Sequence, residues 1–356
     1  MQQIIFYKYI KNIKVIGFKK NDNFVLLIIK GMKKIAIIMG GYSSEYKISL
    51  TSGNVAYQYL DKKKFCGYRV HILKEKWVYV DDANNEYLID KNDFTVIVNN
   101  EKIVFDCIFN AIHGTPGEDG LMQAYFQLLG IPQNSCSYYQ AALTFNKRDL
   151  LSVLKPHGIK SATSFYLNLG DEIDEEVIIN KVGLPCFVKP NKSGSSFGIS
   201  KVKTKDELLA AINNAYKEDD ELIIESFLNG IEVSVGVINF KGEILVLPIT
   251  EIVSENDFFD YEAKYLGKSQ EITPARISEA IAEKIRAVAK KAYTVLKMSG
   301  FSRSEFILVN DEPIMIEMNT IPGLTTESLI PQQAKVAGIT LEDLFTNSIE
   351  LALAKK

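Results

Sequence analysis

Four polar residues near the C-terminal end of the chain could converge on a metal ion. Arg303 and Glu305 share one face of a predicted strand, because side chains alternate between the two faces of a strand. Glu317 and Asn319 share one face of the next predicted strand. A hairpin loop of three or five residues would place Glu305 opposite this pair. Two carboxylates and an amide oxygen favour Mg²⁺, and the alternative is a solvated sheet edge with scattered acids.

Phosphate groups could be bound by two lysines and a loop rich in glycine and serine. The loop, residues 191–198, lies between two short predicted strands, so its backbone N–H groups could approach an anion. Lys147 and Lys189 could add positive charge at the same place. The loop alone could equally be a flexible connection. The Walker sequence and the kinase HRD and DFG pair are both missing, so a different nucleotide-binding fold is required.

Two further turns are unusually polar for their position. Residues 40–45 read GGYSSE and residues 113–120 read HGTPGEDG, and each follows a predicted buried strand. Ligands of open α/β sheets bind at the carboxyl ends of the strands, where such turns lie. The spacing is not GxGxxG, so a dinucleotide fingerprint is absent.

The elements that must position these residues predict an α/β domain followed by α+β regions. Residues 32–130 alternate strands and helices, with strands at 35–39 and 104–109 and helices at 48–60 and 121–129. Residues 131–222 contain a predicted helix 138–154, strands 185–189 and 199–202, and a capping box of Thr204 and Glu207. Residues 223–356 contain a hairpin turn at 241–242, an amphipathic helix 277–297 and strands 303–309 and 313–319 joined by Asn310 and Asp311.

Composition excludes several classes of protein. The 356 residues are 47% apolar with a net charge of −3, which leaves no overall positive field for a nucleic acid or an anionic membrane. A small partner is therefore expected. The four cysteines lie far apart without a CxxC pair, which indicates a reducing compartment and no disulfide framework or zinc site.

Residues 1–31 differ from the rest of the chain. They hold six lysines and one acid, Asp22, and their apolar run 24–29 is too short for a signal peptide or a membrane span. We expect a loosely attached basic arm or an extension before a start at Met32, followed by a buried strand.

From Met32 onward the chain resembles the D-alanine:D-alanine ligases of the ATP-grasp superfamily. The resemblance rests on five segments that occur in the family's order: GGYSSEYKIS (40–49), HGTPGEDG (113–120), FVKPNKSGSSFG (187–198), FDYEAKY (259–265) and MNTIPGLT (318–325). It implies an ATP-grasp fold, with an N-terminal βα domain over 32–130 and two subdomains, 131–222 and 223–356, that clamp ATP. It also implies ATP-dependent synthesis of D-alanyl-D-alanine, through a D-alanyl phosphate, for peptidoglycan and the cell wall.

The resemblance also implies roles for individual residues. For ATP it implies phosphate contacts by Lys147 and Lys189 under a hairpin that includes Ser196, and a further contact by Lys264. It also implies adenine contacts by Glu225 and the Leu228 N–H, and a ribose contact by Glu232. Two Mg²⁺ ions, which Mn²⁺ could replace, would be held by Glu305, Glu317 and Asn319. For the amino acids it implies Glu45 on the first ammonium, His113 near the activated carboxylate, Arg303 and Gly323 on the oxyanion, and Ser328 and Leu329 on the second carboxylate. Ser195, Glu45 and Tyr265 would form a hydrogen-bonded set.

One position departs from the family, and other functions stay open. Glu305 stands where the family usually has aspartate. The side chain is one methylene longer, and the octahedral geometry of a Mg²⁺ site must accommodate this extra length. The alternatives are a D-alanyl-D-lactate ligase, another ATP-grasp ligase that joins a carboxylate to an amine, and an inactive nucleotide-binding regulator. The resemblance implies a cytoplasmic enzyme, commonly a homodimer, that contacts D-alanine but no nucleic acid or membrane.

Overall fold

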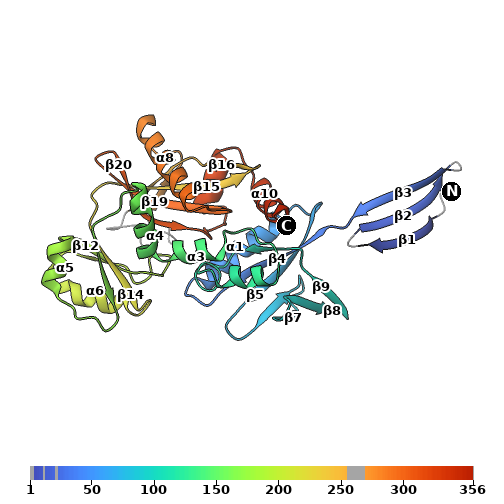
Figure 1. Cartoon of the computed structure of the whole chain (residues 1–356), viewed down its shortest axis with the longest axis horizontal. Coiled ribbons are helices and arrows are strands. Elements are labelled where there is room, and N and C mark those ends of the chain that lie inside the picture. The colour runs from blue at the N-terminus through green and yellow to red at the C-terminus, as the bar shows by residue number, and fades with distance from the viewer. Residues whose placement is uncertain (1–3, 11–12, 21–22, 255–268, 356) are drawn as a thin grey trace.

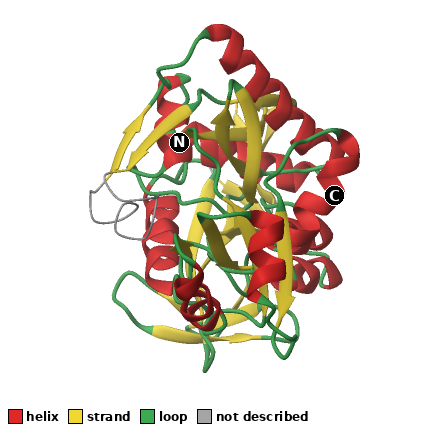
Figure 2. Ribbon diagram, turned by 90° about the vertical axis from the view of Figure 1, so that its left-hand side faces the viewer, coloured by secondary structure: helices red, strands yellow, loops and turns green. Residues whose placement is uncertain are grey.

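The computed structural model describes residues 4–10, 13–20, 23–254 and 269–355. These residues form four β-sheets. Figure 1 shows a three-stranded sheet at one end of the molecule and the four-stranded sheet with its helices at the other. In Figure 2, helices lie along the outer sides and strands between them. None of the helices in these ranges is long and apolar enough to cross a membrane.

The N-terminal sheet consists of three antiparallel strands, β1 (Ile4–Ile10), β2 (Ile13–Lys20) and β3 (Asn23–Lys30). It projects from the rest of the molecule (Figure 1), and within the described ranges its strands pair only with one another. The expected basic arm therefore has regular structure, which we did not predict.

The predicted βα region is built around a seven-stranded sheet of order β10-β4-β5-β6-β7-β8-β9. Its strands are β4 (Lys33–Gly40), β5 (Phe65–Ile72), β6 (Trp77–Val80), β7 (Glu86–Asp90), β8 (Thr95–Val98), β9 (Glu101–Val104) and β10 (Cys107–Asn110). Strands β10, β4 and β5 are parallel, and the others are antiparallel. Its helices are α1 (Tyr46–Gln58) and α2 (Leu121–Leu128). The side chains of 35–39 are fully buried, as a central parallel strand requires.

Two elements that the sequence predicts as continuous, one in the βα region and one directly after it, are each divided in the structure. The expected strand 104–109 is divided between β9 and β10, because the Asp106 carboxylate accepts a 2.9 Å hydrogen bond from the Lys34 N–H. The expected helix 138–154 is two helices, α3 (Tyr138–Phe145) and α4 (Lys147–Leu154). Asn146 is extended between them, and its side chain caps α4 by accepting from the Asp149 N–H.

The four-stranded antiparallel sheet has the order β11-β14-β12-β13. Its strands are β11 (Ser164–Asn168), β12 (Cys186–Pro190), β13 (Ser200–Val202) and β14 (Glu221–Ser226), and its helices are α5 (Glu175–Val182) and α6 (Leu208–Ala215). Short 3₁₀ helices lie at η1 (Lys155–His157) and η2 (Lys205–Glu207). The predicted capping box of Thr204 and Glu207 is present at η2 and leads into α6.

The last sheet has the order β18-β17-β15-β19-β20, and β16 also pairs with β15. Its strands are β15 (Ile231–Phe240), β16 (Glu243–Val246), β17 (Thr250–Ser254), β18 (Ser269–Ile272), β19 (Phe301–Val309) and β20 (Glu312–Asn319). Its helices are α8 (Glu279–Val295), α9 (Leu329–Val336) and α10 (Leu341–Ala354). The predicted apolar stripe of α8 faces the core, where Ile285 and Ala292 are fully buried.

Candidate active site

Two adjoining cavities lie where the three larger sheets meet. The first cavity is lined by the two polar turns of the seven-stranded sheet, by β19 and β20, and by the segment 321–329. The second cavity is lined by β12 and β14 on one side and by β15, β17 and β19 on the other. Five residues line both cavities: Lys147, Ser193, Gly194, Ser195 and Glu317. Groups bound in the two cavities would therefore meet at these residues.

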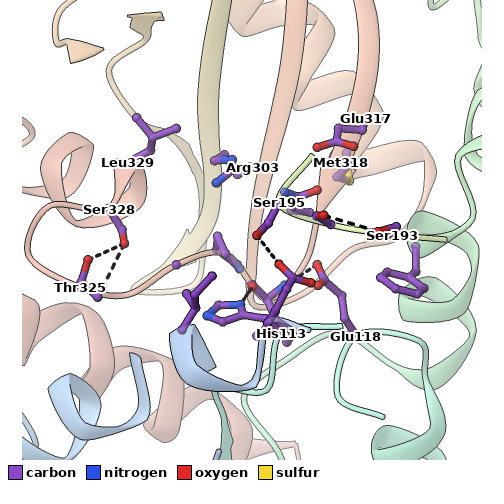
Figure 3. Close-up of a pocket in the computed structure, with 18 of the residues that line it drawn as sticks. His113, Glu118, Ser193, Ser195, Arg303, Glu317, Met318, Thr325, Ser328 and Leu329 are labelled. Atoms are coloured by element: carbon purple, nitrogen blue, oxygen red, sulfur yellow. Dashed lines mark hydrogen bonds between the residues drawn. The ribbon is translucent and has the colours of Figure 1, made fainter. Parts of the chain in front are cut away.

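The loop 191–198 closes over the junction of the cavities and contacts the turn after β4 of the seven-stranded sheet. The Ser195 hydroxyl donates a 2.5 Å hydrogen bond to Glu45 Oε1 (Figure 3). Gly194 lies so close to Glu45 that a Cβ atom there would be 2.6 Å from Oε2, so only glycine fits without a shift. The Lys147 ammonium donates to the Ser193 carbonyl over 2.8 Å. The loop thus makes polar contacts on both sides of the junction.

His113 is buried and held in one orientation by two partners. Its Nδ1 lies 2.8 Å from the Ile321 carbonyl, which can only accept, so Nδ1 carries the proton. Nε2 lies 2.9 Å from the Ser52 hydroxyl, which then donates to it. Burial lowers the pKa of His113, and Arg303 lowers it further, although the Glu45 charge and the Ile321 carbonyl oppose them. His113 is therefore neutral at pH 7.

Glu118 is a buried acid that sequence reasoning did not single out. Its carboxyl oxygens accept hydrogen bonds from the backbone N–H groups of Gly114, Thr320 and Ile321, at 3.2, 3.3 and 3.4 Å. Burial, and next the nearby charge of Glu45, raise the pKa of Glu118 to about 7. These bonds join the 113–120 turn to the chain after β20. An acid inside a polar turn at the end of a strand was the available signal.

The β19–β20 hairpin brings Glu305 opposite Glu317 by way of a β-bulge. The turn has only two residues, Asn310 and Asp311, with φ of 49° and 62°. If the register set by this two-residue turn continued without a bulge, Glu305 would face Ile316. A β-bulge, in which Ile316 has no partner, shifts the register by one residue and places Glu317 opposite Glu305. The predicted pairing and the predicted turn residues are both confirmed, although the loop of three or five residues on which the pairing was made conditional is not present.

Positive side chains neutralise this acidic pair. Arg303 Nη2 lies 2.5 Å from Glu305 Oε1, and Lys147 Nζ lies 3.2 Å from Glu317 Oε2. Asn319 pairs with Arg303 across the hairpin.

No group of three histidine, cysteine, aspartate or glutamate residues that could hold a metal occurs in the described part of the chain. Two carboxylates and one amide nevertheless fit Mg²⁺, which commonly completes its octahedron with water and phosphate oxygens.

The second cavity contains a buried ion pair with one free acceptor. Lys189 Nζ lies 2.7 Å from Glu225 Oε2, and both side chains are buried. Burial lowers the pKa of Lys189, but the Glu225 carboxylate outweighs it, so the pKa of this lysine is raised. Among the described residues, Glu225 Oε1 has no hydrogen-bond partner, although it is buried. A buried acceptor left without a donor is costly, and the amino group of a bound base would satisfy it.

The far end of the first cavity is formed by the start of α9. Ser328 precedes the helix, and its hydroxyl lies 2.8 Å from that of Thr325 (Figure 3). A Cβ atom on Gly323 would lie 2.7 Å from Ser328 Oγ, so a side chain there would force Ser328 to shift. The backbone N–H groups of the first turn of a helix attract anions. This end of the cavity is suited to a carboxylate.

Every predicted site residue within the described ranges lines one of the two cavities. The first cavity includes Glu45, His113, Lys147, Ser195, Arg303, Glu317, Asn319, Gly323, Ser328 and Leu329. The second includes Lys147, Lys189, Ser195, Ser196, Glu225, Leu228, Glu232, Glu305 and Glu317. Lys264 and Tyr265 lie outside the described residues. Sequence reasoning missed Glu118, Ser52 and Glu271, a further acid of the first cavity.

Two family models match consecutive parts of the chain. The model described as the N-terminus of D-ala D-ala ligase matches residues 34–136, and the model described as its C-terminus matches residues 154–350. Together they include most of the chain and, apart from Lys147, all the described residues with predicted roles.

Individual relatives agree with the family models. The chain is 77% identical over 323 residues to a D-alanine--D-alanine ligase of Flavobacterium johnsoniae, which covers 91% of this chain and 100% of the relative. The crystal structure of the VanG D-Ala:D-Ser ligase from Enterococcus faecalis is 31% identical, with a TM-score of 0.78, and covers 90% of this chain and 99% of its own. A D-alanine--D-alanine ligase from Bacillus anthracis complexed with ATP is 26% identical, with a TM-score of 0.72, and covers 91% of this chain and 98% of its own. The chain therefore belongs to the D-alanine--D-alanine ligase family and has its ATP-grasp fold.

Proposed function

We propose that this ligase joins two D-alanine molecules in two steps. A carboxylate oxygen of the first D-alanine attacks the γ-phosphorus of ATP, the bond to ADP breaks, and D-alanyl phosphate forms. The amine of the second D-alanine then attacks the carbonyl carbon, loses a proton, and displaces inorganic phosphate. The observation that carries this proposal is the wall shared by the two cavities, because a phosphate from one and a carboxylate from the other can meet there.

The second cavity would hold the nucleotide. The buried acceptor Glu225 Oε1 suits the amino group of adenine, and guanine presents a carbonyl instead. Leu228 would contact the ring through its N–H, and Glu232 would contact the ribose. Lys147, with Lys189 and Ser196, would contact the phosphates, and Lys264 would join them.

Glu305, Glu317 and Asn319 would hold two Mg²⁺ ions, or Mn²⁺ in their place. When bound, these ions would neutralise the phosphate charge that opposes attack by a carboxylate. The chain's own contribution is the position of these three side chains on facing strands. Lys147, now 3.2 Å from Glu317, can contribute its charge to the phosphate instead.

The first cavity would orient the D-alanine that becomes activated. The Glu45 carboxylate would bind its ammonium group while accepting the Ser195 hydrogen bond, so loop closure and occupancy support each other. His113 is neutral and fixed, and it would lie beside the reacting carboxylate without adding charge. Closure of the loop also excludes water, which would hydrolyse an acyl phosphate.

Arg303 and the Gly323 backbone would stabilise the oxyanion that forms during amide synthesis, and this is electrostatic catalysis. Ser328 and Leu329 would bind the carboxylate of the second D-alanine at the start of α9.

The VanG relative is named for D-serine as its second substrate. Acceptor choice therefore differs within the structural neighbours, and D-lactate or D-serine remain alternatives to D-alanine for this chain. An inactive nucleotide-binding regulator is the non-enzymatic alternative, which the retained site residues do not favour.

We also propose that the enzyme is a cytoplasmic homodimer that supplies D-alanyl-D-alanine for peptidoglycan. The four cysteines are free thiols, which supports a reducing compartment. The composition offers no positive field for nucleic acid or membrane.

The direct test of this function is mass spectrometry of the product formed from ATP, Mg²⁺ and D-alanine, with D-lactate and D-serine as competitors. We expect D-alanyl-D-alanine and release of phosphate that depends on D-alanine. Nucleotide binding without phosphate release would favour the regulator, and a dominant ester or D-seryl product would favour the other acceptors.

A further inference from the structure

The first cavity carries a carboxylate to which the proposed reaction assigns no role. Glu271 lies on β18, the edge strand of its sheet, and lines the cavity together with Arg303, Ser328 and Leu329. We infer that Glu271 binds the ammonium group of the acceptor amino acid and so makes the enzyme prefer an amine to a hydroxyl acceptor. The inference rests on the proposed function and names a specificity residue within it.

The first argument is the way α9 places this carboxylate. Ser328 is the N-cap of α9, and Gln332 lies in the first turn of that helix. Gln332 Nε2 donates to Glu271 Oε2 over 2.9 Å and to the Glu327 carbonyl over 2.6 Å. The amide therefore holds the Glu271 carboxylate beside the first turn of the helix.

The same helix turn provides the complementary site. The first intrahelical bond runs from the Gln332 N–H to the Ser328 carbonyl, at 3.0 Å, so the N–H groups of Leu329 and Ile330 precede it. Pro331 has no N–H to offer. An α-amino acid separates its ammonium from its carboxylate by one carbon. A carboxylate bound at the start of α9 would thus place the ammonium within reach of a neighbouring anion.

The other acids of the cavity are held by groups outside α9 or face solvent. Glu45 accepts the Ser195 hydrogen bond, Glu118 is held by three backbone N–H groups, and Glu317 pairs with a lysine. Glu327 is exposed. Among the described residues of this wall, Glu271 is the carboxylate that a side chain of α9 positions.

The chemical consequence is discrimination by charge. A carboxylate beside the acceptor attracts an ammonium group and accepts its hydrogen bonds. A 2-hydroxy acid such as D-lactate has a neutral hydroxyl group where D-alanine has its ammonium group, so its binding is strengthened less by Glu271. Removal of the negative charge should weaken D-alanine binding as acceptor and leave D-lactate almost unaffected.

The test compares Glu271→Gln with Glu327→Gln, a matched change of an exposed acid in the same cavity wall. Two rates are measured. Isotope exchange within the phosphates of ATP, driven by D-alanine, reports formation of the acyl phosphate, whereas mass spectrometry of D-alanyl-D-alanine and D-alanyl-D-lactate reports the acceptor step. A third variant, Gln332→Leu, keeps the Glu271 charge but removes its support.

For Glu271→Gln we expect the D-alanine concentration that half-saturates dipeptide synthesis to rise on the order of tenfold, since a charge-assisted hydrogen bond is lost. The ester fraction should rise, and isotope exchange should stay unchanged. Gln332→Leu should shift the same two quantities less, and Glu327→Gln should shift neither. Unchanged half-saturation and ester fraction in Glu271→Gln would overturn the inference, as would an equal loss of isotope exchange. Absence of D-alanine-driven exchange in the unsubstituted protein would instead contradict the proposed function itself.

Discussion

The hydroxyl of Ser195 donates a 2.5 Å hydrogen bond to the carboxylate of Glu45, 150 positions earlier in the chain. Ser195 lies in the loop between the two cavities, and Glu45 lies at the start of α1. Ser195 has φ of 49°, a left-handed conformation that costs energy for a residue with a side chain. The contact with Glu45 helps to offset this cost and links the closed loop to the wall of the first cavity.

Replacement of Ser195 by alanine should lower kcat/KM for D-alanine on the order of tenfold to a hundredfold, because a hydrogen bond to a charged group is lost. The melting temperature should change little, since the loop is only partly buried. D-alanine-dependent phosphate release measures the effect. Ser193→Ala is the control, because the carbonyl of Ser193, and not its hydroxyl, accepts from Lys147. Equal losses in both variants would contradict a specific role for the Glu45 contact.

Glu305→Gln should strongly raise the Mg²⁺ concentration needed for activity and leave the fold intact. The change removes one anionic oxygen ligand while it keeps the size of the side chain. Glu305→Asp, the usual family residue, should be tolerated. Glu312→Gln at the other end of the same hairpin is the control, because Glu312 pairs only with lysines among the described contacts. A Mg²⁺ titration of Glu305→Gln that matches the unsubstituted protein would show that Glu305 is not a ligand.

Glu118 predicts a pH dependence of stability. Its pKa is raised from 4.5 to about 7, so the folded protein retains this proton between these pH values while the unfolded chain loses it. Stability must therefore fall as pH rises from 4.5 to 7, by about 3 kcal/mol at most for this group. Glu118→Gln should remove this dependence. Urea unfolding of both proteins at pH 5, 6, 7 and 8 checks it, and parallel curves would contradict the raised pKa.

Residues 1–31 should be dispensable for the reaction. Strands β1 to β3 pair only with one another in the described chain, and the first family match begins at residue 34. A protein that begins at Met32 should keep its melting temperature and turnover. Loss of soluble protein or of activity would show that the N-terminal sheet has a structural or catalytic role.

Tyr265 lies outside the described residues, so its predicted role rests on the family resemblance alone. A neutral phenol adds no charge that would repel an incoming amine. Tyr265→Phe removes its hydrogen bond and Tyr265→His adds a titratable cation, so both should raise D-lactate use, most clearly below neutral pH for histidine. Product ratios across pH 6 to 9 measure this. An unchanged ratio in both variants would place Tyr265 away from the acceptor.

The pairing of Glu305 with Glu317 shows how far periodicity alone could predict the site. Alternation along two strands correctly placed the four polar side chains on one face of the hairpin. The bulge at Ile316 could not be predicted, because a register shift arises from the pairing of two whole strands. The two-residue turn and the extra residue of the bulge together give the pairing that a loop of three or five residues would have given.

Side-chain contacts between distant segments were the least predictable features. The break at Asn146 had a local signal, since asparagine often caps helices, yet the continuous apolar pattern favoured one long helix. Glu118 and Glu271 acquire their surroundings from segments about 200 and 60 residues away. Their sequence neighbours carry no sign of these partners.

The central claim is that the two cavities meet so that a D-alanine carboxylate receives the γ-phosphoryl group. The most direct measurement uses D-alanine labelled with ¹⁸O in its carboxylate, ATP and Mg²⁺, followed by mass spectrometry of the phosphate released. The account predicts one ¹⁸O atom in inorganic phosphate for each D-alanyl-D-alanine formed, because the oxygen that attacks phosphorus leaves with it. Unlabelled phosphate, or ¹⁸O recovered in AMP, would contradict the acyl phosphate and the site described for it.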